Sequence, residues 1–159
     1  MTDFCKVFFL GDSRSGKTAL ISKLVGRPYT DYRMSVGLPK TRLEANGVHF
    51  ELLENPGNDG FSSNTRLFYR AAQLIVLVFS LSSQDSLEGI KRWLGEIRQF
   101  ARPDVPLVLL GCGQGERLIA YEEASAQAQR EGLVYTEVQL AESLDSEQVL
   151  LWFYRQIHS

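Results

Sequence analysis

A short glycine-rich motif, directly after an apolar run near the amino terminus, constrains this chain more than any other feature. The motif follows residues 6–10 and fits the pattern G-x-x-x-x-G-K-[ST]. Its eight residues are Gly11, Asp12, Ser13, Arg14, Ser15, Gly16, Lys17 and Thr18. Such a loop, between a strand and a helix, surrounds a phosphate group with backbone N–H groups, and the positive end of the helix dipole points at the same group. The chain is therefore predicted to bind a phosphate-bearing ligand at these positions.

Three side chains of the motif receive individual roles. Lys17 is expected to reach the β and γ phosphates of a nucleotide, and the Thr18 hydroxyl to ligate Mg²⁺. Arg14 either contacts phosphate or is a solvated side chain at a tolerant position. A chance match in a loop is the alternative interpretation, and the strand-like run before the motif argues against it.

Six strand-like runs are predicted, at residues 6–10, 41–45, 49–53, 74–81, 107–110 and 134–138. The first, fourth and fifth are almost continuously apolar, which indicates parallel strands buried on both faces. Asn46-Gly47 between the second and third runs is a strong hairpin signal, because both turn residues must take positive φ. One antiparallel pair is therefore expected in an otherwise parallel sheet.

Helical patterns fill the gaps, at residues 16–25, 87–101, 120–131 and around 150–157. Asp85, with Glu88 three residues later, is predicted to cap the second helix, and Gly132 to end the third. Strands that alternate with helices predict an α/β fold: a six-stranded, mostly parallel sheet with one antiparallel hairpin strand and helices on both faces. Ligands of such sheets bind at the carboxyl ends of the strands.

Composition and charge exclude several classes of protein. The 159 residues fit a single domain, 1–159. Their 17 Lys and Arg against 19 Asp and Glu give a net charge of −2 and no basic footprint for nucleic acid. Cys5 and Cys112 are far apart, which fits a reducing, cytoplasmic setting. The longest apolar run, residues 74–79, is too short to span a bilayer. The final residues, RQIHS, hold no prenylation box, so no intrinsic membrane anchor is expected.

The chain resembles the Ras-like small GTPase superfamily from Lys6 to about Ile157, in its strand order, its hairpin and its phosphate loop. Residues 79–90 and 100–111 are similar to the Rho branch, whereas residues 32–37 look as much like the Rab branch. The resemblance implies a three-layer P-loop NTPase fold that binds GTP or GDP with Mg²⁺. It also implies protein partners at the two switch segments, residues 29–40 and 55–70.

The switch segments differ from the family pattern in part. Ser35 stands where the family has a Thr that binds Mg²⁺ and the γ-phosphate, and Gly57 keeps an N–H that could meet that phosphate. Glu54 replaces an Asp and is one methylene longer, which would misplace a water-mediated contact to Mg²⁺. Asn58 replaces the Gln that orients the attacking water. Hydrolysis is therefore expected to be very slow or absent.

The largest departure falls at the guanine-binding motifs. Where the family reads Asn-Lys-x-Asp, this chain has Cys112-Gly113-Gln114-Gly115. A guanine base would therefore lack the Asp carboxylate that accepts its hydrogen bonds and the Lys side chain that packs against it. Where the family reads Ser-Ala-Lys, it has Gln139-Leu140-Ala141. Glu116 is either a solvated carboxylate or a substitute for the missing Asp. Guanine affinity is expected to be several orders of magnitude lower.

The sequence is compatible with three functions. The first is a degenerate small GTPase that serves as a protein-interaction module and binds little or no nucleotide. The second is a switch held in one state by bound GTP that it does not hydrolyse. The third, a phosphatase or kinase acting on another nucleotide, has no catalytic base in the sequence to support it.

Overall fold

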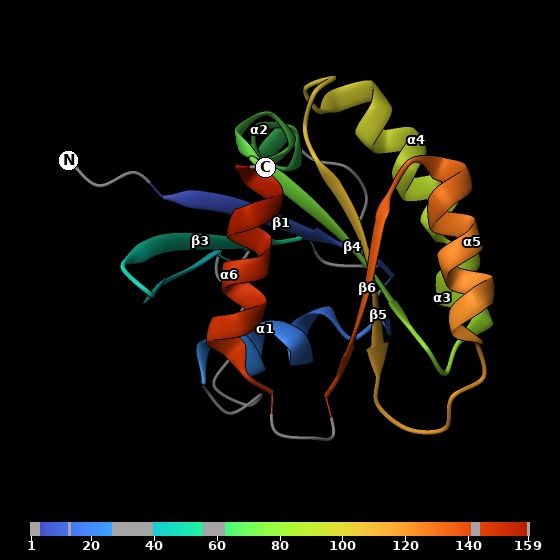
Figure 1. The fold of residues 1–159 in the computed structure, drawn as a ribbon. Coiled ribbons are helices and arrows are strands. Elements are labelled where there is room, and N and C mark those ends of the chain that lie inside the picture. Colours follow the sequence, from blue (N-terminus) through green and yellow to red (C-terminus); the bar gives the residue numbers. More distant parts are fainter. Residues whose placement is uncertain (1–3, 13, 27–39, 56–62, 141–143, 159) are drawn as a thin grey trace.

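The computed structural model describes the chain except residues 1–3, 13, 27–39, 56–62, 141–143 and 159, and for residues 63 and 64 the backbone alone. The strands are β1 (Cys5–Leu10), β2 (Lys40–Ala45), β3 (Val48–Glu54), β4 (Leu74–Ser80), β5 (Leu107–Gly113) and β6 (Val134–Gln139). The helices are α1 (Lys17–Val25), α2 (Ser63–Ala71), α3 (Gln84–Glu88), α4 (Ile90–Phe100), α5 (Tyr121–Glu131) and α6 (Ser146–Ile157) (Figure 1).

The six strands form one sheet in the order β2-β3-β1-β4-β5-β6. Every neighbouring pair is parallel except β2 and β3. The turn between those two strands has positive φ at Asn46 (54°) and at Gly47 (76°), as a type I′ hairpin requires. The predicted fold class, with its single antiparallel strand, is confirmed.

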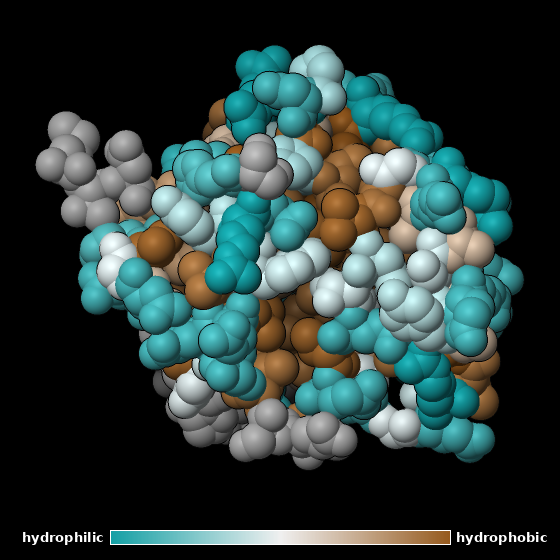
Figure 2. Space-filling model, in the orientation of Figure 1, coloured by the Kyte–Doolittle hydropathy of each residue, from teal (hydrophilic) through white to brown (hydrophobic). Residues whose placement is uncertain are grey.

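Helices cover both faces of the sheet and make three layers (Figure 1). Alternate residues of β1 show the division: Val7 and Phe9 join the cluster under α1 and α6, whereas Phe8 and Leu10 join the cluster under α2 to α5. Because side chains of a strand alternate between faces, a continuously apolar strand buries both. Apolar residues show on the face in Figure 2 as patches between hydrophilic ones. No helix in the described part of the chain has the length and hydropathy needed to cross a bilayer.

The helix predicted over residues 87–101 is wrong in its bounds and in its cap. The structure has two helices there, α3 and α4, with Gly89 between them. Ser83, rather than Asp85, caps the first of them, since its side chain accepts a hydrogen bond from the Ser86 N–H. The helical spacing of apolar residues continues across Gly89, so the sequence pattern does not reveal that two helices meet there. At the other predicted helix end, Gly132 takes a left-handed conformation and ends α5 as expected.

One helix has no sequence-based prediction at all. The α2 segment has a mean composition that is polar, and Leu67 on its surface is 62% exposed. Tyr69 is its anchor, because its ring is fully buried against Phe8 and Phe100. The segment is nevertheless amphipathic, which is a signal that could have predicted it, and packing by aromatic side chains holds the helix in place.

Candidate functional site

The phosphate-loop motif lies where β1 ends and α1 begins, at the carboxyl edge of the sheet. Gly11 passes so close to β4 that a Cβ there would overlap the Val78 carbonyl oxygen. Gly16 precedes α1 with a φ of 104°, a conformation that favours glycine. Between them, the Ser15 N–H donates to the Asp12 carbonyl at 3.0 Å, which closes a tight turn. Both glycines of the motif are therefore required by the path of the backbone.

The Lys17 side chain folds back over the loop. Its Nζ donates to the carbonyl oxygens of Gly11 (2.6 Å) and Asp12 (3.0 Å), and the residue is only 3% exposed. Burial lowers the pKa of the Lys17 amine to about 8, while the nearby carboxylates of Glu54 and Asp12 act in the opposite direction. The loop therefore holds a buried ammonium group whose partners are neutral carbonyls.

Thr18, at the start of α1, contacts the end of β3. Its hydroxyl donates to Oε1 of Glu54 at 2.6 Å. Glu54 is 4% exposed, and its second oxygen, Oε2, is buried without a hydrogen-bond partner among the described residues. A hydroxyl and a carboxylate are oxygen ligands of the kind that Mg²⁺ prefers, so Thr18 and Glu54 fit a hard divalent cation.

Buried polar atoms without partners gather at this edge of the sheet. In the described part of the chain there are four such side-chain atoms, and three of them belong to Ser15, Glu54 and Asn55. All three residues flank the loop, at its centre or at the carboxyl end of β3. Because an unpartnered buried polar atom is costly, this concentration indicates a place built to receive a polar ligand.

Asp12 ties the loop to a helix that sequence reasoning did not connect to it. Its Oδ1 accepts from Arg92 Nη2 (2.7 Å) and from the Trp93 indole Nε1 (3.1 Å), both on α4. Its Oδ2 lies against Gly89, where a Cβ would overlap it. These residues are about 80 positions apart in the sequence, and nothing in their spacing signals the contact. Arg14, by contrast, is exposed at the rim of the loop, as the solvated interpretation expects.

The next part of the edge is where the resemblance places the guanine base. The Gln139 side chain lies over Gly113 and fills the space that any side chain at position 113 would enter. The Leu140 N–H donates to the Gly113 carbonyl at 2.8 Å, which extends the pairing of β5 and β6 by one bond. Cys112 is fully buried against Gly16, and burial raises the pKa of its thiol to about 12. A side chain at position 113 would therefore fit only if the Gln139 side chain moved.

The segment after β5 has an unusual backbone. Gly115 has a φ of 147°, where an Asp side chain would be strained. The following residue is held by its main chain, because the Glu116 carbonyl accepts from Ser82 Oγ at 2.5 Å. The side chain of Glu116 is exposed, which agrees with a solvated carboxylate. An Asp at position 115 would therefore need either a strained φ or a different path of the backbone.

The parallel sheet and the phosphate loop define a P-loop nucleotide-binding protein, and comparison with known proteins gives its family. The model of the Ras family matches residues 6–159, so the chain belongs to the Ras family. This confirms the resemblance to Ras-like small GTPases, whose members bind GTP or GDP with Mg²⁺.

Rab and Ypt proteins are among its relatives. The Ras-related protein Rab-1D of Dictyostelium discoideum is 28% identical over 162 residues, which cover 97% of this chain and 79% of that protein. The GTP-binding protein ypt1 of Schizosaccharomyces pombe is 29% identical over 160 residues, covering 96% and 79%. The GTP-binding protein YPTM1 of Zea mays is 28% identical over 154 residues, covering 92% and 74%.

The predicted site residues divide into two groups. The structure brings seven of them together around the loop: Gly11, Asp12, Arg14, Ser15, Gly16, Lys17 and Thr18. The other three, Ser13, Ser35 and Gly57, lie outside the described residues, as do Asn58, residues 29–39 of the first switch segment and residues 56–62 of the second. Sequence reasoning missed the direct bond between Thr18 and Glu54 and the tie from Asp12 to α4.

Proposed function

We propose that this protein is a degenerate member of the Ras family that acts as a protein-interaction module in signalling or trafficking. It keeps the phosphate loop and has lost guanine specificity and useful hydrolysis. The observation that carries the proposal is the pair of glycines at positions 113 and 115, because Gly113 lies under the Gln139 side chain and Gly115 has a φ of 147°, so neither offers the side chain that the family uses to hold guanine. The module is a single cytoplasmic domain, 1–159. Its two described cysteines, Cys5 and Cys112, are buried free thiols, in keeping with that compartment.

Hydrogen-bond energies support weak guanine binding. A hydrogen bond to a charged group contributes about 1.5–3 kcal/mol, so losing two of them at position 115 lowers affinity by about 100-fold or more. The Leu140 N–H is committed to the Gly113 carbonyl and offers no replacement. A Gly115→Asp substitution would not simply restore the bonds, because an Asp is strained at the φ that Gly115 adopts.

The sequence of the second switch supports the loss of hydrolysis. Asn58 is shorter than the Gln of the family, and a positioning error of about 1 Å can reduce a rate about 100-fold. We propose that the working surface is the pair of switch segments, residues 29–40 and 55–70, and that it binds proteins rather than nucleic acid. The net charge of −2 supports protein partners.

A constitutively GTP-bound switch is the second candidate, and the phosphate half of the site favours it. Lys17 and Thr18 are in place, and buried oxygens of Ser15, Glu54 and Asn55 beside the loop have no hydrogen-bond partner within the described part of the chain. Ser35 and Gly57 would complete the contacts to Mg²⁺ and the γ-phosphate. When bound, Mg²⁺ would neutralise phosphate charge, with Thr18 and Ser35 as its protein ligands and the Glu54 carboxylate beside Thr18. The relatives named as GTP-binding proteins add weight to this candidate.

Bound nucleotide separates the two candidates. The purified protein is denatured, and the supernatant is analysed by anion-exchange chromatography, with the ypt1 relative as the positive control. We expect no stoichiometric nucleotide and no rise in melting temperature with Mg·GTP. Stoichiometric GTP would overturn the empty module and establish the second candidate. Stoichiometric GDP, or single-turnover hydrolysis at the rate of the control, would overturn both.

A further inference from the structure

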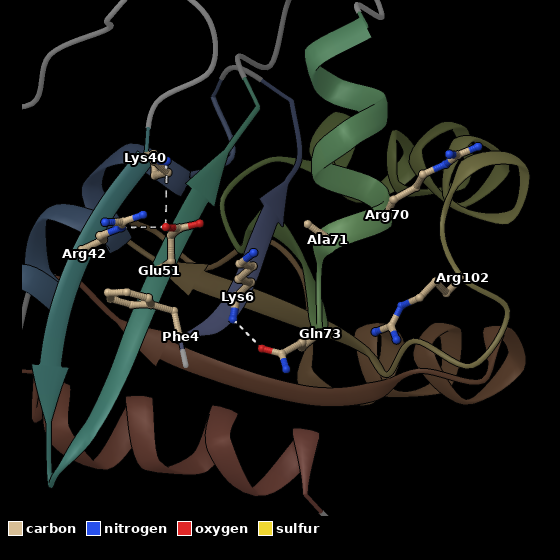
Figure 3. Close-up of a pocket in the computed structure, with 9 residues that line it drawn as sticks. All are labelled: Phe4, Lys6, Lys40, Arg42, Glu51, Arg70, Ala71, Gln73 and Arg102. Atoms are coloured by element: carbon tan, nitrogen blue, oxygen red, sulfur yellow. Dashed lines mark hydrogen bonds and ion pairs between the residues drawn. The ribbon is translucent and has the colours of Figure 1, made fainter. Parts of the chain in front are cut away.

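A basic pocket lies on the side of the sheet covered by α2, away from the phosphate loop. It has a volume of about 540 Å³ and opens between the strands β1 to β3, the end of α2 and the segment after α4 (Figure 3). Its ionisable lining residues are Lys6, Lys40, Arg42, Arg70, Arg102 and Glu51. Among the described residues, five cationic side chains and one carboxylate therefore line the pocket, in a chain whose net charge is −2.

Three side chains on neighbouring strands form the floor of this pocket. Glu51 of β3 lies beside Arg42 of β2 on one side and beside Lys6 of β1 on the other. Arg42 Nε binds Glu51 Oε2 at 2.8 Å, and Lys40 Nζ lies 4.0 Å from the same atom. The single carboxylate of the pocket is thus already neutralised from the β2 side.

The cations on the opposite side keep their charge uncompensated. Lys6 has no carboxylate partner among the described residues, and neither has Arg102, whose Nη2 binds the Ala72 carbonyl at 2.9 Å. In Figure 3 the Arg102 side chain extends toward Lys6 and Gln73, whereas Arg70 points away from them. Lys6 and Arg102 are therefore the cations best placed to meet an anion in the pocket.

We propose that this pocket binds a small molecule bearing several phosphate groups, of the inositol polyphosphate kind. The volume lies within the range of about 300–1,000 Å³ that is usual for small-ligand sites. Arginine and lysine are the side chains that bind phosphate oxygens, and arginine does so in bidentate fashion. Among the lining residues only Phe4 and Ala71 are apolar, so a peptide would find little of the apolar anchoring that protein interfaces use.

This site is separate from the phosphate loop. Lys6 is the second residue of β1 and Gly11 follows its end, a separation of about 16 Å along an extended strand. The proposal therefore does not depend on nucleotide binding, and Lys17→Ala can distinguish the two sites. That variant removes the cation of the loop and leaves every lining residue of the pocket unchanged.

Isothermal titration with myo-inositol hexakisphosphate tests the proposal. We expect saturable binding by the intact protein and by Lys17→Ala, and at least about tenfold weaker binding by Lys6→Glu. Lys91→Glu makes the same charge change at an exposed position of α4 outside the pocket, and it should bind as the intact protein does. Glu51→Gln removes the only carboxylate of the pocket and should strengthen binding, an outcome that misfolding cannot produce.

Two further arms identify the source of the phosphate groups. Sedimentation with phosphatidylcholine vesicles, with and without phosphatidylinositol bisphosphate, distinguishes a lipid headgroup from a free ligand. Binding to the vesicles or to the free ligand supports the proposal if the Lys6→Glu variant loses that binding. Loss of hexakisphosphate binding in Lys17→Ala alone, or equal loss in Lys6→Glu and Lys91→Glu, would overturn it. Binding of a polyglutamate peptide in preference to hexakisphosphate would also overturn it, in favour of an acidic protein partner.

Discussion

The two halves of the candidate nucleotide site differ in how the surrounding structure holds them. In the phosphate half, Asp12, Lys17 and Thr18 each bond to a partner that fixes the loop, from α4, from the loop itself and from β3. In the half near β5 and β6, Gly113 has only an exposed Gln139 side chain above it. Packing and buried bonds thus fix the phosphate half, whereas position 113 in the other half faces a side chain that can move aside.

The largest effect is expected at the closest backbone approach in the phosphate half. Gly11→Ala would force its Cβ into the Val78 carbonyl oxygen, and neither strand can move without disturbing the sheet. We expect the free energy of unfolding in urea to fall by about 3 kcal/mol or more. A loss below about 1 kcal/mol would show that this half is as adaptable as the other.

A second prediction uses the buried amine of Lys17. Burial lowers the pKa of Lys17 to about 8 from its ordinary value of 10.5, so between pH 8 and pH 10 the unfolded chain binds more protons at this group. Its contribution to the unfolding free energy should therefore rise with pH in that window. We expect a rise of about 2 kcal/mol relative to Lys17→Met, measured by denaturant titration at each pH. Parallel curves for both proteins would contradict it.

The bond between Thr18 and Glu54 gives a smaller effect. Thr18→Val keeps the shape of the side chain but leaves Glu54 Oε1 buried without its donor. The unfolding free energy should fall by about 1–2 kcal/mol. Thr18→Ser retains the hydroxyl and serves as the matched control. Equal losses in the two variants would assign the effect to the lost methyl group instead.

The smallest effect is expected at Gly113. In Gly113→Ala the added Cβ meets the far end of the Gln139 side chain, which can rotate away into solvent. We expect a change below about 1 kcal/mol, within the range of ordinary surface substitutions. The double variant Gly113→Ala with Gln139→Ala should restore the original stability. A loss as large as that of Gly11→Ala would remove the contrast between the two halves.

Local signals in the sequence were sufficient for most of the fold. The strands β1, β4 and β5 are apolar on both faces, and Asn46-Gly47 specifies its own turn, so each is readable from a few adjacent residues. The break at Gly89 was not readable, whereas α2 has an amphipathic pattern that could have predicted it. A glycine can occur within a helical pattern, so Gly89 gives no signal by itself. It is needed because the Asp12 carboxylate lies where a Cβ at position 89 would be. The position of α2 depends on the burial of Tyr69, which is a tertiary contact.

The candidate site also has one part that the sequence predicts and one part that it does not. The phosphate loop is contiguous, so its motif predicted the backbone path and the placement of Lys17 and Thr18. Glu54 is 36 residues from Thr18 along the chain, and its bond to the hydroxyl depends on how β3 pairs with β1. The Gln139 side chain covers Gly113 because β6 lies beside β5. Contacts between distant segments follow from sheet register, which no single motif encodes.

The tie between Asp12 and the indole of Trp93 has a spectroscopic consequence. The Trp93 ring is buried, and its Nε1 has a charged acceptor on the loop. Any event that displaces Asp12 alters that hydrogen bond and hence the emission of the indole. Trp152 on α6 packs in the other layer and provides a constant background. The protein therefore carries an intrinsic fluorescent reporter of its loop, readable without a label.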